Sequence, residues 1–431
     1  MPVSRGRKAK KSKKRPQRTV VVRRAEPDAV FSKVSGSPLA ELADVLESLL
    51  GQGDVPEWWG QSQERLIDAS RGLLAATSPR TLEQAAAELI GGELYTAVTE
   101  GHSGLRFEVW ANELTDRLVS RIRDTADNGD WQGPWWLLQG LASIGSDGLG
   151  GWAEEQAAKA AVSLPAGWQA SQPAWLTSMT EIRATGDVRA MRDTYGTRFG
   201  VIAEFRYPEG TGPFWYLFDI DVSGFFVLAG AGVFDEADQA AEAWRDAVGI
   251  SAEGLTPAPL TPDVLTCLTY FGSEERYTDG DESRMLLDNW FRAPRRISDL
   301  IRALAKRGVA LPPYRSLHED IDSGPMADEF TAWYSERHGR PLDDEVAEAL
   351  ASEWLEGIMP GTEHAVSPGR SAYYRRLVST DWLDDPVTAQ VLAVLPEWVR
   401  WHGEQSGLPA HLLDIAVKAA QADSASLATE E

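Results

Sequence analysis

Hydrophobic residues recur every three or four positions through much of this chain, which is the spacing of a helix with one buried face. The clearest case is "SPLAELADVLESLL", with Ser37 as the expected N-cap. Its apolar positions are Leu39, Leu42, Val45, Leu46 and Leu49. Further helices are expected near residues 59–75, 79–99, 104–126 and 149–163, with loops such as "DNGDWQGPWW" between them. Residues 37–165 are therefore predicted to form a helical domain.

A pattern typical of β-strands follows the connection "SLPAGWQASQPAW". A helix is expected near residues 175–194, before three runs of β-branched and aromatic residues at 199–207, 214–222 and 225–234. The turn sequences "PEGTGP" and "SG" separate these runs, and such turns usually join antiparallel strands. The stretch "DEADQAAEAWRDAVG" then predicts a helix with Asp235 at its N-cap and a glycine beyond its end. Residues 172–250 are predicted to form a small α+β module, an antiparallel sheet with one packed helix.

The stretch "TPAPLTP", at 256–262, has the composition of a linker, and the pattern beyond it is helical to about residue 421. Breaks are expected at "GVALPPY", "GRPL" and "IMPGTEHAVSPG". The predicted fold class is α+β and predominantly α-helical. Helical domains at 37–165 and 259–421 flank the small module, and residues 422–431 form a frayed C-terminus.

The composition is that of a folded protein, since 43% of the 431 residues are hydrophobic and 25% are charged. Seventeen tryptophans favour packing in a core over ligand binding. The single cysteine, Cys267 in "VLTCLTY", excludes an intrachain disulfide and is expected to be a buried structural thiol. The longest apolar run, "FFVLAGAGVF", is too short to span a bilayer. We therefore expect a cytoplasmic protein with no membrane partner.

Charge is divided very unevenly along the chain. The net charge is −23, yet residues 1–24 hold eleven of the 42 basic residues and no acidic one, so the other residues carry −34. The eleven are Arg5, Arg7, Lys8, Lys10, Lys11, Lys13, Lys14, Arg15, Arg18, Arg23 and Arg24. Because these charges cannot be buried, residues 1–35 are expected to be a disordered basic tail. One expected partner of the tail is nucleic acid or nucleoprotein. Because the tail has no aromatic residue before Phe31 to stack on bases, such contacts should be to phosphates and without sequence preference. The alternative is that the tail lies against the acidic remainder of the chain or only solvates the N-terminus.

A second basic segment lies at residues 284–307, "RMLLDNWFRAPRRISDLIRALAKR". Its helical apolar face is predicted to contain Ile297, Leu300, Ile301 and Leu304. The outer face is predicted to carry Arg295, Asp299, Arg302 and Lys306. Arg295, Arg302 and Lys306 are candidates for a second contact with an anionic ligand. The alternative, which we favour, is that these cations pair with acidic residues elsewhere in the chain.

The stretch "WYLFDIDVSGFF" resembles the first motif of haloacid-dehalogenase-type phosphotransferases. The resemblance implies that Asp219 is a nucleophile and Asp221 a general acid and base, with Mg²⁺ between the carboxylate and a phosphate. It covers about ten residues, and the downstream sequence lacks the parallel strands and helices that this fold requires. We therefore favour a solvent-facing acidic pair on a hairpin.

Other motifs point to no cofactor and no metal. Gly230-x-Gly232 lies where a dinucleotide site would begin, but Asp235 would repel a pyrophosphate, so a β-bulge or tight packing is the better interpretation. The order of three strands and a helix, with "FDEADQAAEAW", resembles the small modules of HicB-type antitoxins in topology alone. The six histidines are scattered and do not form a zinc motif; they are His102, His318, His338, His364, His402 and His411.

Three functional hypotheses remain. The first is a non-catalytic protein that contacts nucleic acid or nucleoprotein through the basic tail. The second is a protein–protein adaptor that binds through Trp-rich helical surfaces, with the tail only a solubilising arm; large exposed Trp patches would favour it. The third is an enzyme of unrecognised type, including the Asp219 and Asp221 phosphotransferase, which a pocket with converging carboxylates would favour.

Overall fold

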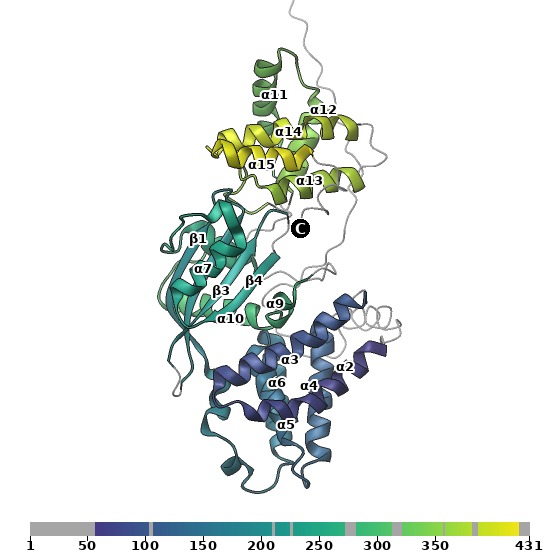
Figure 1. Cartoon of the computed structure of the whole chain (residues 1–431), viewed down its shortest axis with the longest axis vertical. Helices are drawn as coiled ribbons and strands as arrows, with labels where there is room; N and C mark the ends of the chain where they lie inside the picture. The colour runs from purple at the N-terminus through teal and green to yellow at the C-terminus, as the bar shows by residue number, and fades with distance from the viewer. Residues whose placement is uncertain are drawn as a thin grey trace, which may run out of the picture. The chain divides into compact units, whose positions relative to one another are not determined.

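The computed structural model confirms the predicted fold class, because it contains many α-helices and one four-stranded antiparallel sheet (Figure 1). It describes residues 57–102, 107–208, 212–224, 227–271, 282–312, 321–356, 358–381 and 387–421. The basic tail, the helix predicted after Ser37 and the C-terminal residues 422–431 lie outside the described residues. Among the described helices, none is long and apolar enough to cross a membrane.

Five helices come before the sheet. They are α2 (Glu57–Ala69), α3 (Pro79–Thr99), α4 (Phe107–Asp124), α5 (Gln132–Ile144) and α6 (Asp147–Ala161), with the 3₁₀ helices η1 (Ser70–Ala75), η2 (Trp168–Ser171) and η3 (Ala174–Glu181). Four of the five lie where the sequence pattern predicts a helix. Helix α5 does not, because eleven of its thirteen residues are buried, and a helix that is apolar all round shows no amphipathic period.

The sheet has the order β1-β2-β3-β4, with every neighbouring pair antiparallel. Its strands are β1 (Arg183–Arg192), β2 (Arg198–Arg206), β3 (Phe214–Asp221) and β4 (Val227–Phe234). The three predicted strands are confirmed as β2, β3 and β4. The helix predicted near residues 175–194 is wrong, since η3 leads into β1 there. Strand β1, "RATGDVRAMR", is poor in β-branched residues and breaks register beside Gly186, whose φ is 81°, so its sequence carries little strand signal.

Helix α7 (Ala237–Val248) packs on one face of this sheet through Trp244. A Cβ atom at Gly200 of β2 would lie 2.9 Å from ring atoms of Trp244, so glycine is required for this close approach. The N-cap of α7 is Glu236 rather than the predicted Asp235. The opposite face is covered by α8 (Pro262–Phe271) and α10 (Arg292–Lys306), which share a core with β2, β3 and β4 (Figure 1).

The segment predicted as a linker follows the short η4 (Gly249–Ala252) and is joined to the sheet. Ala258 forms an isolated antiparallel bridge with Ala190 of β1, with reciprocal N–H···O distances of 2.8 and 2.9 Å. Residues of this proline-containing segment therefore pack along the edge of the sheet.

Helix α9 (Arg284–Asp288) and the start of α10 contribute to two cores. Leu287, Trp290 and Phe291 pack with the helices that precede the sheet. Ala293 and Ile297, only a few residues further on, pack against the sheet. This segment therefore connects the two cores.

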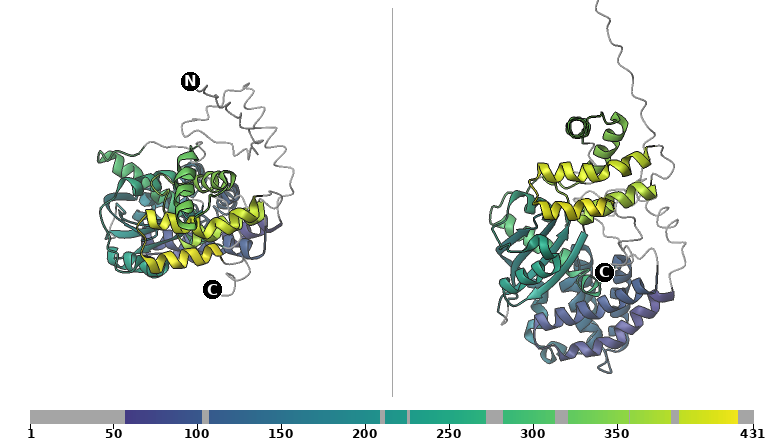
Figure 2. Two further views of the ribbon diagram at one scale, coloured as in Figure 1. Left: turned by 90° about the horizontal axis from the view of Figure 1, so that it is seen from above. Right: turned by 45° about the horizontal axis from the view of Figure 1, so that its top comes forward.

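Five C-terminal helices form a further core around Phe330, Trp354, Trp398 and Trp401. They are α11 (Gly324–His338), α12 (Asp344–Leu355), α13 (Pro368–Asp381), α14 (Thr388–Gln405) and α15 (Ala410–Gln421). Figure 2 shows α14 and α15 running alongside each other. The breaks predicted at "GRPL" and "IMPGTEHAVSPG" separate α11 from α12 and α12 from α13.

Candidate functional site

The eleven cations of the basic tail lie outside the described residues, so their role stays a prediction. The other candidates, Arg295, Arg302 and Lys306, all lie on α10. Arg302 contacts Asp147 at 2.9 Å and Asp299 at 2.6 Å, and Arg295 lies 3.6 and 3.4 Å from the same two carboxylates. The side chain of Arg295 is only 12% exposed, so it does not lie on the outer face as expected.

A network of buried charges lies behind these residues. Glu83 of α3 is 2% exposed, and its carboxylate accepts hydrogen bonds from Arg296 Nη2 and from the Tyr207 hydroxyl. Arg296 Nη1 also donates to Asp299 at 2.8 Å. Burial by itself lowers the pKa of Arg296, but Glu83 and Asp299 outweigh it and raise that pKa. The network joins α3, α10 and the end of β2.

Asn289, which is 3% exposed, joins this network through Arg292, whose Nη1 lies 3.9 Å from Glu83 Oε1. Its Oδ1 accepts from Arg292 Nη2 at 2.7 Å and from the Tyr216 hydroxyl at 2.7 Å, and its Nδ2 donates to the Ala231 carbonyl at 3.0 Å. Arg292 Nη1 donates to Gln84 Oε1 at 2.7 Å. Sequence reasoning missed Glu83, Asn289 and Arg292 as a group, because residues far apart along the chain meet only in the fold.

Arg292 lies at the floor of a groove of about 1200 Å³. One wall is α3, with Arg80, Gln84 and Glu88; the others are the end of β4 and helix α9. Both cations and carboxylates line it, and we refer to it below as the α3 groove.

Asp219 is not part of a solvent-facing pair, so that expectation is wrong. It is 2% exposed, and it accepts from Arg198 Nε at 2.9 Å, Arg198 Nη2 at 2.7 Å and Trp244 Nε1 at 3.0 Å. Asp221 is partly exposed and accepts from the Ser223 backbone N–H. Burial raises the pKa of Asp219, and the bonds from Arg198 and Trp244 partly offset this. Because these donors engage both carboxylate oxygens and the surrounding sheet is antiparallel, the arrangement does not fit the phosphotransferase motif.

The glycines of β4 mark a bulge, as predicted. Asp219 pairs with Gly230 and Ile220 pairs with Leu228, which leaves Ala229 as the extra residue. Asp235, the residue that argues against a pyrophosphate, instead binds Arg80 of α3 at 2.6 Å.

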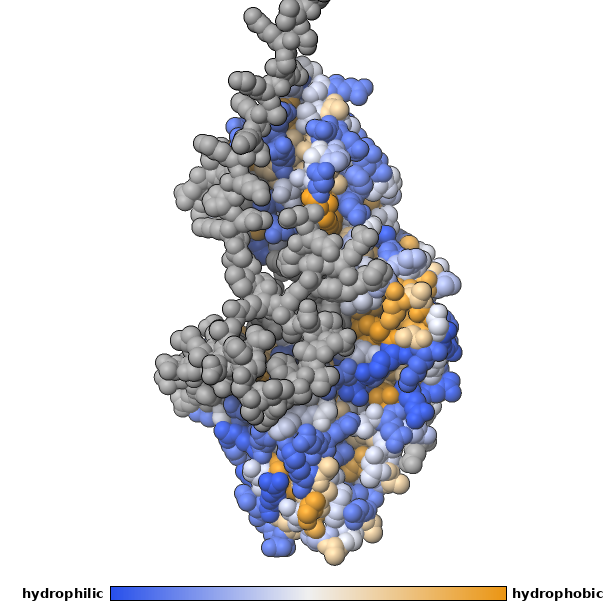
Figure 3. Space-filling model, turned by 180° about the vertical axis from the view of Figure 1, so that it is seen from behind, coloured by the Kyte–Doolittle hydropathy of each residue, from blue (hydrophilic) through white to orange (hydrophobic). Residues whose placement is uncertain are grey.

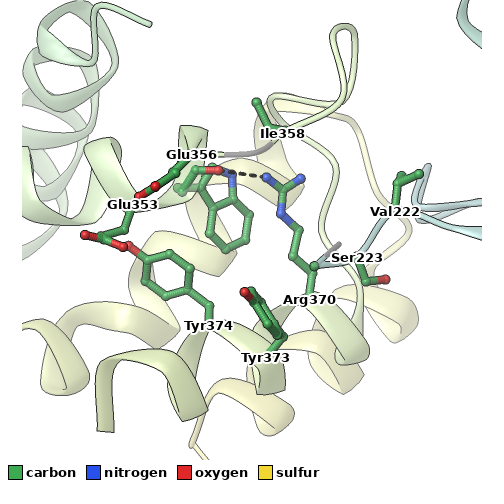
Figure 4. A pocket seen from close by; sticks show the side chains of 10 residues that line it. Val222, Ser223, Glu353, Glu356, Ile358, Arg370, Tyr373 and Tyr374 are labelled. Atoms are coloured by element: carbon green, nitrogen blue, oxygen red, sulfur yellow. Dashed lines mark hydrogen bonds between the residues drawn. The ribbon is translucent and has the colours of Figure 1, made fainter. Parts of the chain in front are cut away.

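A narrow cleft surrounds Arg370 of α13, between the C-terminal helices and Ser223 (Figure 4). The guanidinium donates to the carbonyls of Thr362, Ala365 and Trp354 at 2.9, 2.9 and 3.0 Å and lies 4.1 Å from the centre of a Trp354 ring. Burial lowers the pKa of Arg370 to about 9. The cleft holds about 20 Å³, enough for roughly one water, so Arg370 acts as a structural clamp rather than as a ligand site.

The described histidines, cysteine and acids do not form a cluster of three that could hold a metal ion. Cys267 is fully buried as predicted, and burial raises its pKa. Within the described part of the chain, every tryptophan is buried or partly buried. Trp58 and Trp110, for example, stack with ring centres 5.9 Å apart. The described tryptophans therefore serve packing.

No protein-family model matches this chain, and no solved structure matches it significantly. Its function must therefore be argued from its own residues.

Proposed function

We propose that this protein binds nucleic acid through the basic tail, by contacts to phosphates that are blind to sequence. The observation that carries this proposal is the charge separation along the chain. Residues 1–24 hold eleven cations and no acid, whereas the other residues carry a net charge of −34. A polycation finds its strongest complement in a phosphate backbone, because each neutralised phosphate releases a counterion.

The described residues support the assignment of phosphate binding to the tail, because many of their cations already pair with carboxylates. Arg65 binds Glu93 at 2.6 Å, Arg192 binds Asp263 at 3.0 Å, and Lys159 binds Glu155 at 2.7 Å. Hydrophilic residues predominate on the face shown in Figure 3. Because the residues outside the tail carry a net negative charge, their average surface repels nucleic acid. The attraction must therefore come from the tail. With one cysteine, which is buried, the protein also suits the cytoplasm, where we place its activity.

The test replaces Lys8, Lys10, Lys11, Lys13 and Lys14 by Gln in the full chain. A matched variant replaces the same five residues by Arg and keeps their charge. Binding of labelled duplex DNA and structured RNA is measured over a salt series between about 50 and 200 mM, where six to ten phosphate contacts lose roughly 10³–10⁵ in affinity. We expect the Gln variant to bind more weakly, with a shallower salt dependence, and the Arg variant to retain binding.

Equal affinity of the Gln variant and the unmodified protein would overturn the proposal. So would the absence of binding at about 50 mM salt, where such contacts are strongest. Preserved binding in the Arg variant separates a loss of charge from a loss of particular side chains.

A further inference from the structure

Three guanidinium groups follow one face of α3 in the α3 groove. Arg80 belongs to the helix itself, Arg292 donates to Gln84 Oε1 at 2.7 Å, and Arg284 donates to the Glu88 carbonyl at 2.5 Å. Positions 80, 84 and 88 lie on successive turns of one helix face, so their Cα atoms are spaced by roughly 6 Å along the axis. These three guanidiniums line the groove together with three carboxylates, those of Glu88, Asp235 and Asp288.

Each cation is held in place before any ligand arrives. Arg292 is 2% exposed and fixed by two N–H bonds to Asn289 Oδ1, at 3.0 and 2.7 Å. Arg80 lies 5.5 Å from the ring centre of Phe214. Arg284 is bonded to α3 and to Asp288. Binding to groups that are already ordered costs little side-chain entropy.

The carboxylates of the groove leave room for another anion. Arg80 contacts Asp235, whose side chain is 75% exposed, and Arg284 contacts Asp288 at 2.7 Å. Asp235 is exposed, and exposed pairs contribute about 0–1 kcal/mol, so a stronger anion can displace it from Arg80. Asp288 is 18% exposed and keeps its pair with Arg284 Nε, while Arg284 Nη2 bonds α3, which leaves Nη1 for a ligand. Each guanidinium also has five N–H donors, more than these pairs consume.

The end and one wall of the groove also favour an anionic ligand with an uncharged part. Ser78, the N-cap of the 21-residue helix α3, and Thr81, in its first turn, form a capping box at one end of the groove, where the helix dipole is positive. Met285, which is 53% exposed, and Val233 supply an apolar wall. The groove therefore combines two partly exposed guanidiniums, Arg80 and Arg284, with an apolar surface suited to an uncharged ring.

We infer that the α3 groove binds a phosphate-bearing small molecule. Its phosphate groups bind Arg80 and Arg284, whose side chains are partly exposed, and its uncharged part packs on Met285. Arg292 is buried, and its Nε, Nη1 and Nη2 already donate to Asn289 and Gln84, so it contributes its charge alone. Guanidinium forks match phosphate oxygens in geometry and charge, and a volume of about 1200 Å³ admits a ligand the size of a nucleotide. The inference involves no residue of the basic tail and does not rest on the proposed nucleic-acid binding.

Titration calorimetry on the full chain tests this with three probes: inorganic phosphate, pyrophosphate and ATP. The test variant is Met285→Glu, which places a negative charge in the groove at an exposed position. Its matched control is Ile250→Glu, at a residue that is 54% exposed and does not line the groove. A second pair compares Arg284→Gln with Arg71→Gln, since Arg71 forms an exposed pair with Asp130 elsewhere.

We expect saturable binding of at least one probe, weakened about tenfold or more, or 1.4 kcal/mol, by Met285→Glu and Arg284→Gln but not by their controls. Tighter binding of ATP than of pyrophosphate identifies a nucleotide, and equal binding identifies the phosphate groups alone as the ligand. Absence of saturable heat with all three probes overturns the inference. It is also overturned if the five-lysine Gln variant of the tail abolishes binding while the groove variants retain it, because the probes then bind the tail.

Discussion

His364 and His402 face each other through their Nδ1 atoms, 3.0 Å apart, at the core of the C-terminal helices. His402 is fully buried, stacks at 15° on Trp354 and lies close to Arg370. Burial, followed by His364 and Arg370, lowers the pKa of His402 well below its usual value of about 6.5. One imidazole must donate and the other accept, so this contact requires at least one neutral ring.

This contact predicts loss of stability in mild acid. The folded state keeps His402 neutral, while the unfolded chain takes up a proton as the pH falls below about 6.5, so stability is full above that pH and declines below it. The contribution is at most about 1.4 kcal/mol per pH unit. Urea unfolding followed by Trp fluorescence between about pH 7.5 and 5.5 measures it, and the slope should be smaller in His402→Phe.

His411 supplies the control, because it is an exposed histidine on α15. His411→Asn should leave the pH dependence unchanged. If His402→Phe retains the same slope as the unmodified protein, the histidine contact is not its source.

Asp219→Asn should destabilise the sheet. The same substitution at a solvent-facing aspartate would have little effect on stability. The change leaves Arg198 without its carboxylate, and breaking a buried pair costs about 3–5 kcal/mol; because the Arg198 side chain is 24% exposed, we expect about 2 kcal/mol. Asp221→Asn should cost less than about 1 kcal/mol, since its bond is to one backbone N–H. Chemical denaturation of the two variants gives the comparison, and equal effects would contradict this account of Asp219.

Glu83→Gln should be among the most disruptive single changes in the protein. The change removes the negative charge that Arg296 and Arg292 share. Because Arg296, the nearer of the two to Glu83, is fully buried, we expect the free energy of unfolding to fall by about 3–5 kcal/mol. Glu64→Gln is the matched control, because Glu64 pairs with Arg117 and Arg121 at an exposed position. The expected cost there is at most about 1 kcal/mol, measured in the same denaturation experiment.

Gly200→Ala should displace Trp244 and lower stability by roughly 1–3 kcal/mol, the usual cost of overpacking. Gly151→Ala, in α6, is the control, since a Cβ atom there meets nothing within 4 Å. That change should stabilise the protein by about 0.5–1 kcal/mol, because alanine favours the helix. Thermal unfolding of both variants tests whether stability falls in Gly200→Ala and rises in Gly151→Ala. Unchanged stability in Gly200→Ala would show that α7 can move away from the sheet without cost.

Much of the fold could be predicted from periodicity and turn sequences, because strands β2, β3 and β4 alternate between turns that carry clear signals. Three features, helix α5, strand β1 and the burial of Asp219, were not predicted, and each has a physical reason. Helix α5 is buried on all sides, and β1 reads as a polar segment. Asp219 looks exposed in the sequence because an acid on a hairpin usually is, and only the packing of Trp244 over Gly200 shows otherwise.

The candidate site was less accessible to sequence reasoning. The segment 284–307 was recognisable as basic, and Arg295 and Arg302 do pair with acids as favoured. Nothing in the sequence indicates that Arg292 and Arg284 reach α3, about 200 residues earlier, because such contacts depend on tertiary packing alone.

The proline-containing stretch at 256–262 looks like a natural place to divide the chain for expression, but the residues after it make that choice unsound. Trp290 packs edge-on against Phe107 at 5.3 Å, and Ile297 lies in the core of the sheet. A fragment that stops at this stretch would expose hydrophobic surface on both the helical and the sheet halves, and would be prone to aggregate. Any useful shortened version of the protein has to retain residues 57–306 as one piece.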